Sequence, residues 1–192
     1  MAKSDNTVKL TYKIVEPDKP IKWTDVKKTL ASKEPKELLA LIKDFYSLNQ
    51  QNKTFIQTKY SLIDPIKPYK EIIEECLYPD YRKPINLSGG KKAVSQYRKA
   101  VGDPKGILDL MVFYVECGTN FACEYGSIDE KFYCSLESMF DNALQALAKS
   151  DKGTIEEFLP RLQNIVEKAE NVGWGYYDTI IELLYNYFPP EE

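Results

Sequence analysis

Residues that begin and end helices divide almost the whole chain into short segments of helical periodicity. Asp64-Pro65 and Asp103-Pro104 are both typical helix starts, because aspartate caps a helix and proline suits its first turn. The most regular segment spans residues 129–150, where apolar side chains recur every three or four positions: Phe132, Leu136, Met139, Phe140, Ala143, Leu144 and Leu147. The chain is therefore predicted to be all-α, with eight to ten short helices.

These helices are predicted to form a single domain over residues 23–190, preceded by a leader of residues 1–22. The leader alternates apolar and polar residues and is interrupted by Pro17 and Pro20, which suits a short edge strand or a flexible arm. The two Asp-Pro starts lie 39 residues apart, a spacing close to that of HEAT repeats. Both an irregular bundle and a short stack of helical hairpins are compatible with this pattern.

Several local expectations depend on a few residues. Residues 107–115 are apolar on nearly every face, which predicts a buried central helix, although a strand would also suit their composition. Ser88 is expected to open one helix and Thr154 to cap another. Pro160 falls inside the second of these helices, where it is expected to cause a kink or a break.

The residue types that are absent exclude several chemistries. The chain has no histidine, which excludes Ser-His and Cys-His catalytic pairs and imidazole metal sites. The segment around Gly90-Lys91 lacks the first glycine and the Ser/Thr of a P-loop. No apolar run reaches the length of about 20 residues that a membrane span requires. With no secretory pattern at the N-terminus and four cysteines that are read as free thiols, the expected location is the cytoplasm.

Charge is divided unevenly along the chain. Residues 1–100 contain 20 Lys and Arg against 12 Asp and Glu, a net charge of +8. Residues 101–192 contain 6 against 17, a net charge of −11. A basic half and an acidic half in one chain indicate an interaction surface more than a reaction.

The last turn of the chain has a distinctive signature, Gly173-Trp174-Gly175-Tyr176-Tyr177-Asp178. This stretch, together with residues 41–46, 52–55, 68–73, 102–104, 113–116 and 125–133, resembles a widespread bacterial family of uncharacterised helical proteins. The resemblance covers residues 25–188. It implies an all-helical cytoplasmic domain of unknown function and supplies no catalytic residues.

A basic stretch is the first candidate site. A helix start beside lysines can hold a phosphate or carboxylate, and interleaved tyrosines could stack on bases. The candidate anion-binding residues are Arg82, Lys83, Ser88, Gly89, Gly90, Lys91 and Lys92. The simpler interpretation is a solvated helix start, which the acidic isoelectric point near 5.3 favours.

Acidic residues form the second candidate site. Glu137 and Asp141 lie four positions apart on one helical face, and carboxylates from a neighbouring segment could complete a Mg²⁺ or Mn²⁺ site. The weak metal candidates are Glu116, Glu124, Glu137 and Asp141. A solvated face or a helix cap explains these carboxylates more simply, so no metal or other cofactor is expected.

The aromatic turn with Trp174, Tyr177 and Asp178 is the third candidate. Trp174 is expected to anchor the turn in the core, and a ligand pocket with an aromatic wall is the alternative.

Three functional hypotheses remain open. The first is a non-enzymatic module that binds a protein partner or self-associates, with a basic face meeting an acidic one. The second is a nucleic-acid or nucleotide-phosphate binder that uses residues 82–99. The third, an enzyme, is a carboxylate–metal hydrolase. No membrane partner is expected.

Overall fold

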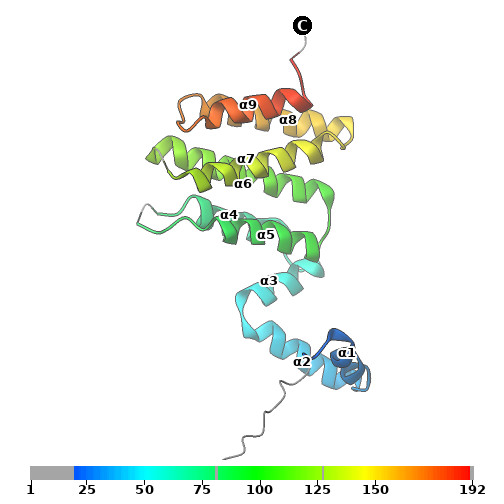
Figure 1. The fold of residues 1–192 in the computed structure, drawn as a ribbon. Helices are drawn as coiled ribbons and strands as arrows, with labels where there is room; N and C mark the ends of the chain where they lie inside the picture. Colours follow the sequence, from blue (N-terminus) through cyan, green and yellow to red (C-terminus); the bar gives the residue numbers. More distant parts are fainter. Residues whose placement is uncertain (1–19, 81, 127, 191–192) are drawn as a thin grey trace, which may run out of the picture. The chain divides into compact units, whose positions relative to one another are not determined.

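The computed structural model describes residues 20–80, 82–126 and 128–190, and Figure 1 shows their fold. Nine helices and no strand are present in these residues, which confirms the all-α prediction. The chain divides into two compact units, residues 1–45 and 46–192. The sequence predicts one domain over 23–190, with a boundary at the end of the leader, and this stays a prediction. Residues 1–19 of that leader lie outside the described residues.

The first unit contains helix α1 (Trp23–Ala31) and most of helix α2 (Pro35–Leu48). The Asp25 carboxylate accepts a hydrogen bond from the Lys22 backbone N–H at 3.1 Å, which caps α1 at its start. Neither helix contains a buried residue. Ile21 and Trp23 are 83% and 68% exposed, so apolar side chains remain accessible on this unit.

The second unit is a stack of helix pairs (Figure 1). Its pairs are α4 (Lys67–Leu77) with α5 (Leu87–Ala100), α6 (Pro104–Tyr125) with α7 (Glu130–Leu147), and α8 (Lys152–Ala169) with α9 (Tyr176–Tyr187). Helix α6 packs against both α4 and α8, and α7 packs against α9. Helix α3 (Gln50–Lys59) packs on α5. Of the two predicted arrangements, the stack of helical hairpins describes this unit.

Helix α6 forms the centre of the stack. Leu110, Val112, Tyr114 and Val115 are fully buried, as predicted for residues 107–115. At Gly118 the neighbouring helix comes so close that a Cβ atom would overlap the Leu136 side chain of α7. Glycine at this position therefore sets how closely α6 and α7 pack.

Aspartate and asparagine side chains determine where the helices begin. Asp103 and Asp129 cap α6 and α7 as the sequence predicts. Helix α5 begins at Leu87 and is capped by Asn86, so Ser88 lies within its first turn. Asp151 caps α8 by accepting a hydrogen bond from the Thr154 backbone N–H at 3.0 Å. The prediction of Thr154 as the cap is therefore wrong.

Pro160 lies inside α8 without breaking it. The helix is continuous from Lys152 to Ala169, so the predicted break does not occur. Proline removes one backbone donor. The packing of Phe158 and Leu162, which are both buried, holds the two sides of the helix in the core.

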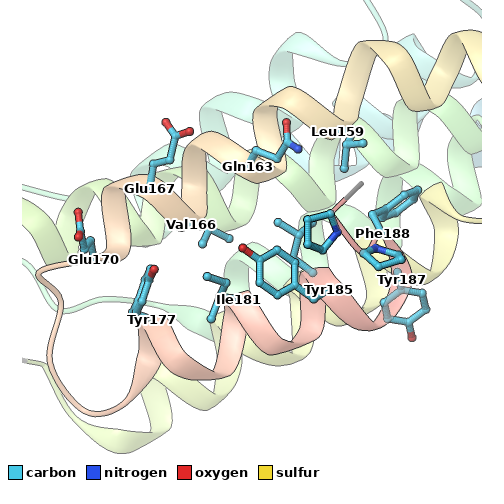
Figure 2. A pocket seen from close by; sticks show the side chains of 13 residues that line it. Leu159, Gln163, Val166, Glu167, Glu170, Tyr177, Ile181, Tyr185, Tyr187 and Phe188 are labelled. Atoms are coloured by element: carbon cyan, nitrogen blue, oxygen red, sulfur yellow. The ribbon is translucent and has the colours of Figure 1, made fainter. Parts of the chain in front are cut away.

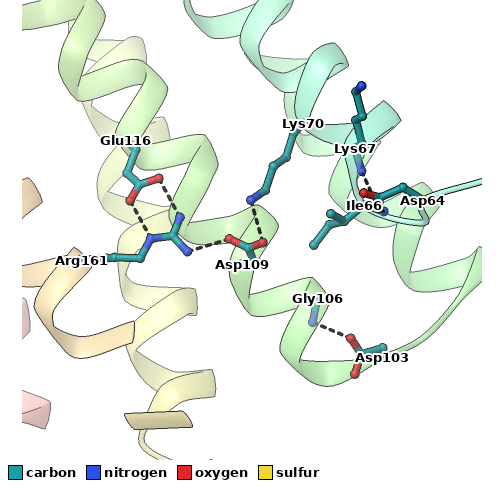
Figure 3. Close-up of polar contacts among 9 residues, drawn as sticks. All are labelled: Asp64, Ile66, Lys67, Lys70, Asp103, Gly106, Asp109, Glu116 and Arg161. Carbon is teal, nitrogen blue, oxygen red and sulfur yellow. Dashed lines mark hydrogen bonds and ion pairs between the residues drawn. The ribbon is translucent and has the colours of Figure 1, made fainter. Parts of the chain in front are cut away.

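An ionic cluster joins α4, α6 and α8 (Figure 3). Arg161 of α8 donates two hydrogen bonds to Glu116, at 2.8 and 2.7 Å, and one to Asp109, at 2.7 Å. Lys70 of α4 pairs with the other oxygen of Asp109 at 2.7 Å. Burial disfavours the guanidinium cation, but these carboxylates outweigh it and hold the pKa of Arg161 above its ordinary value. The cluster fixes the position of the three helices relative to one another.

Alkaline pH is expected to destabilise the second unit through Cys117. Burial, with Glu74 and Glu116 nearby, raises the pKa of this thiol from 9.0 to about 12. Between these pH values the unfolded chain loses a proton that the folded chain keeps, so the free energy of unfolding falls by about 1.4 kcal/mol per pH unit. Urea unfolding between pH 8 and 10.5 should show that the free energy of unfolding falls less steeply with pH for Cys117→Ala than for the wild type. Equal slopes would contradict the assignment.

Candidate functional site

A groove with a volume of about 870 Å³ lies between α8 and α9 on the second unit (Figure 2). Its apolar lining comes from two stripes of helical spacing, one on each helix. These residues are Leu159 and Val166 of α8, and Tyr177, Ile181, Leu184, Tyr185, Tyr187 and Phe188 of the last segment, followed by Pro189 and Pro190. The volume falls in the range of sites that take a side-chain cluster or a small ligand.

The groove lies on the side of the last helix pair that the stack leaves uncovered. The opposite faces of the two helices carry buried residues, among them Phe158 and Leu162 of α8 and Tyr176 and Ile180 of α9. In stacked helical repeats the terminal pair usually presents a polar outer face to water. Here that face is apolar along its floor, and contiguous apolar surface of this kind marks an interaction site.

The polar rim of the groove is acidic. Glu167 and Glu170 are exposed and line one side, together with Gln163. Between Lys168 and Pro190 the sequence contains three acidic residues and no Lys or Arg. The field around the groove therefore favours a cationic ligand over an anionic one.

The structure brings part of the predicted basic site together with a residue that the sequence did not indicate. Lys91 and Ser88 line a shallow pocket of about 520 Å³ with Lys131 and Ser138 of α7. Lys92 is exposed and does not line it. Arg82 pairs with Asp80 at 3.2 Å, and Lys83 is exposed in the same loop. Of the seven predicted residues, Ser88 and Lys91 line this pocket.

The glycines of the predicted anion site are required for packing. The Asn86 side-chain oxygen already accepts a hydrogen bond from the Gly89 backbone N–H at 2.9 Å. This donor is therefore not free for an anion. A Cβ atom on Gly90 would lie 2.8 Å from Cε2 of Tyr114 and even closer to Leu77. These contacts explain the two glycines without a ligand.

Gly90→Ala is expected to lower the free energy of unfolding by about 1–3 kcal/mol, the usual cost of overpacking. Without that overlap, alanine would stabilise the helix by about 0.5–1 kcal/mol. The matched control is Gly153→Ala in α8, where the new Cβ would meet only Asp151, at 3.3 Å. Urea unfolding measures both variants. A stable Gly90→Ala protein would show that packing does not require this glycine.

The four weak metal candidates each have a different environment. Glu116 pairs with Arg161, and Glu124 accepts a hydrogen bond from the Tyr78 hydroxyl, which raises the pKa of Tyr78 to about 12. Burial raises the pKa of Glu137, and Asp141 accepts a hydrogen bond from Tyr187 at 3.0 Å. In the part of the chain that the structure describes, no three Cys, Asp or Glu side chains gather closely enough to hold a metal ion.

The aromatic turn differs from its prediction. Trp174 is 61% exposed, with a left-handed φ of 65°, and stacks on Tyr133 at a centroid distance of 6.5 Å. Tyr176 is the core anchor instead, because its side chain is fully buried and its hydroxyl is 2.8 Å from that of Thr119. Tyr177 lines the groove, and Asp178 is exposed in the first turn of α9.

The four cysteines are free thiols, as predicted, and they differ in burial. Cys117 is buried, Cys76 is half-buried, and Cys123 and Cys134 are exposed. Burial still raises the pKa of Cys123, which keeps its thiol protonated near neutral pH.

Sequence reasoning did not identify the groove. The signal was a second apolar stripe on the last helix, formed by Tyr177, Ile181 and Tyr185 beside the inward stripe of Tyr176, Ile180 and Leu184. An apolar helix of this kind is usually buried on both faces, and only the structure shows that one face is open.

No helix in the described ranges has the length and apolar character needed to cross a bilayer. The chain matches no known protein-family model, and no curated protein or solved structure is significantly similar to it. The resemblance to a bacterial helical family stays a prediction. The fold is a stack of helical hairpins, and any functional assignment depends on the geometry of its surfaces.

Proposed function

We propose that this protein is a non-enzymatic protein-interaction module that receives an amphipathic, basic helix in the groove between α8 and α9. The observation that supports this most directly is the apolar floor and acidic rim on the open side of the terminal helix pair. A helix laid in such a groove buries its apolar face and keeps its charges at the rim. The four free thiols support a cytoplasmic location for this binding.

The dimensions of the groove suit a short helix. Helix α9 has 12 residues, so its wall is about 18 Å long at 1.5 Å per residue. About three turns of a partner helix can lie along it. Apolar side chains at positions i, i+3 and i+7 of that helix would contact Ile181 and Leu184, while lysines at its edges would face Glu167 and Glu170.

Two fluorescent 14-residue peptides test the proposal, one of leucine and lysine and one of leucine and glutamate, both at helical spacing. Fluorescence anisotropy should show that the Leu/Lys peptide binds the wild-type protein at least tenfold more tightly than the Leu/Glu peptide. Tyr185→Asp should weaken Leu/Lys binding at least tenfold, because Tyr185 is 47% exposed on the groove wall. Tyr60→Asp is the matched control, since Tyr60 is 73% exposed and directly follows α3, outside the groove.

Charge reversal at the rim provides the second arm. The double variant Glu167→Lys, Glu170→Lys should bind the Leu/Lys peptide more weakly and the Leu/Glu peptide more tightly than the wild type does. Glu71→Lys with Glu75→Lys changes the net charge equally on α4, away from the groove, and should have little effect. If both double variants lose binding equally, the peptide responds only to net charge and the groove is not its site.

Nucleic-acid or nucleotide-phosphate binding is the second candidate, because Lys91 and Lys131 line one pocket. We rank nucleic-acid binding below peptide binding in the groove, because Asn86 and the packing of Gly90 explain the helix start without a ligand. A labelled single-stranded oligonucleotide is expected to bind wild type and the Lys91→Glu, Lys92→Glu double variant equally weakly. A loss of tenfold or more in the double variant would favour this candidate.

A further inference from the structure

The basic, apolar helix that the groove would receive has a counterpart in this chain. Residues 20–33, which contain α1, carry four lysines and one aspartate, a net charge of +3. On α1 itself, Trp23 and Val26 are exposed and three residues apart, so they share a face, with Leu30 one turn further. The single acid, Asp25, already accepts a hydrogen bond from the Lys22 backbone. These properties match the partner that the groove requires.

We infer that the groove of one copy receives α1 of a second copy. This inference rests on the proposed function and identifies its partner. Trp23 would enter the apolar floor, and Lys27 and Lys28 would face the acidic rim at Glu167 and Glu170. Helix α1 is 9 residues long, about 13.5 Å, and fits within the wall that α9 provides.

This contact joins different surfaces of the two copies and is therefore heterologous. Each copy carries one α1 and one groove, so the contacts either close into a reciprocal dimer, in which each α1 occupies the other copy's groove, or continue into rings or open chains. A groove-to-groove dimer is disfavoured, because it would place the rim residues Glu167 and Glu170 of both copies against each other.

Mixing two variants of the full chain tests the inference. Trp23→Asp disables α1, and Tyr185→Asp disables the groove. Light scattering after size exclusion should show a dimer or larger oligomers for the wild type at 50 mM salt, and monomers at 500 mM salt. Each variant alone should be monomeric at low salt. An equimolar mixture should form a 1:1 dimer and nothing larger, because only one intact groove meets one intact α1.

Two controls keep the outcome interpretable. Trp174→Asp changes the other exposed tryptophan and should assemble like the wild type. Circular dichroism must show that both disabling variants keep their helical content. A wild type that stays monomeric at low salt, or a mixture that stays monomeric, overturns the inference. If the Leu/Lys peptide still binds the wild type in that case, the groove function stands and only the identity of its partner is wrong.

Discussion

Replacing Tyr176 with alanine is expected to lower the free energy of unfolding by about 3–5 kcal/mol, the usual cost of removing a large buried aromatic side chain. Tyr176 is fully buried, contacts the Tyr133 ring at a centroid distance of 5.4 Å and shares a hydrogen bond with Thr119. It therefore attaches the start of α9 to both α6 and α7. A loss of this size should lower the melting temperature by about 10 °C or more.

Two variants separate the parts of this effect. Tyr176→Phe removes only the hydroxyl and should lower the free energy of unfolding by about 1–2 kcal/mol, because Thr119 is left without its buried partner. Tyr185→Ala changes an exposed tyrosine of the same helix and should cost less than about 1 kcal/mol. Thermal unfolding followed by circular dichroism measures all three. If Tyr176→Ala is no more destabilising than Tyr185→Ala, then Tyr176 does not anchor α9.

Replacing Arg161 with alanine is expected to lower the free energy of unfolding by about 2–3 kcal/mol, the second large effect. Removing one partner of a buried ion pair costs about 3–5 kcal/mol, and the value here is lower because the Arg161 side chain is 31% exposed. The variant leaves Glu116 without its bidentate partner, whereas Asp109 keeps Lys70. Urea unfolding should show the loss, and 0.5 M salt should reduce it only in part.

The matched control is Lys105→Ala. Lys105 pairs with Glu157 at 2.7 Å, but both side chains are more than half exposed, so the free energy of unfolding should fall much less than for Arg161→Ala. The loss of stability for Arg161→Lys should lie between those for Arg161→Ala and Lys105→Ala, because lysine keeps the charge and loses the two parallel hydrogen bonds. Equal effects of Arg161→Ala and Lys105→Ala would show that the cluster does not hold the stack together.

The charge division along the sequence has a partly internal explanation. Lys70 belongs to the basic half and Asp109 to the acidic half, yet the two pair across α4 and α6. Part of the charge difference between the two halves therefore forms an ion pair inside the stack. Other charges stay on the surface, among them the lysines of α1 and the acids Glu170 and Asp178.

The sequence predicted those features that depend on local chemistry. The all-α class, the caps at Asp103 and Asp129 and the buried segment 107–115 follow from helix capping and apolar spacing, and the structure confirms them. The predicted start of α5 at Ser88 differs from the observed one because both Asn86 and Ser88 can cap a helix, and in the structure Asn86 is the cap.

Features that depend on tertiary packing could not be predicted in this way. Trp174 and Tyr176 are two residues apart, and either could anchor the turn by its size. The left-handed φ of Trp174 turns it outward, so Tyr176 enters the core. The groove is a similar case, because the apolar stripe of Tyr177, Ile181 and Tyr185 predicts burial, and its exposure depends on what packs beside it.

The most direct test of the proposed binding groove is amide hydrogen exchange of the full chain with and without the Leu/Lys peptide. Exchange should slow in residues 159–170 and 177–188, which form the two walls of the groove. Exchange in α4 and α5 should stay unchanged. Slowing that is confined to α4 and α5, or no slowing anywhere, would contradict the groove as the binding site.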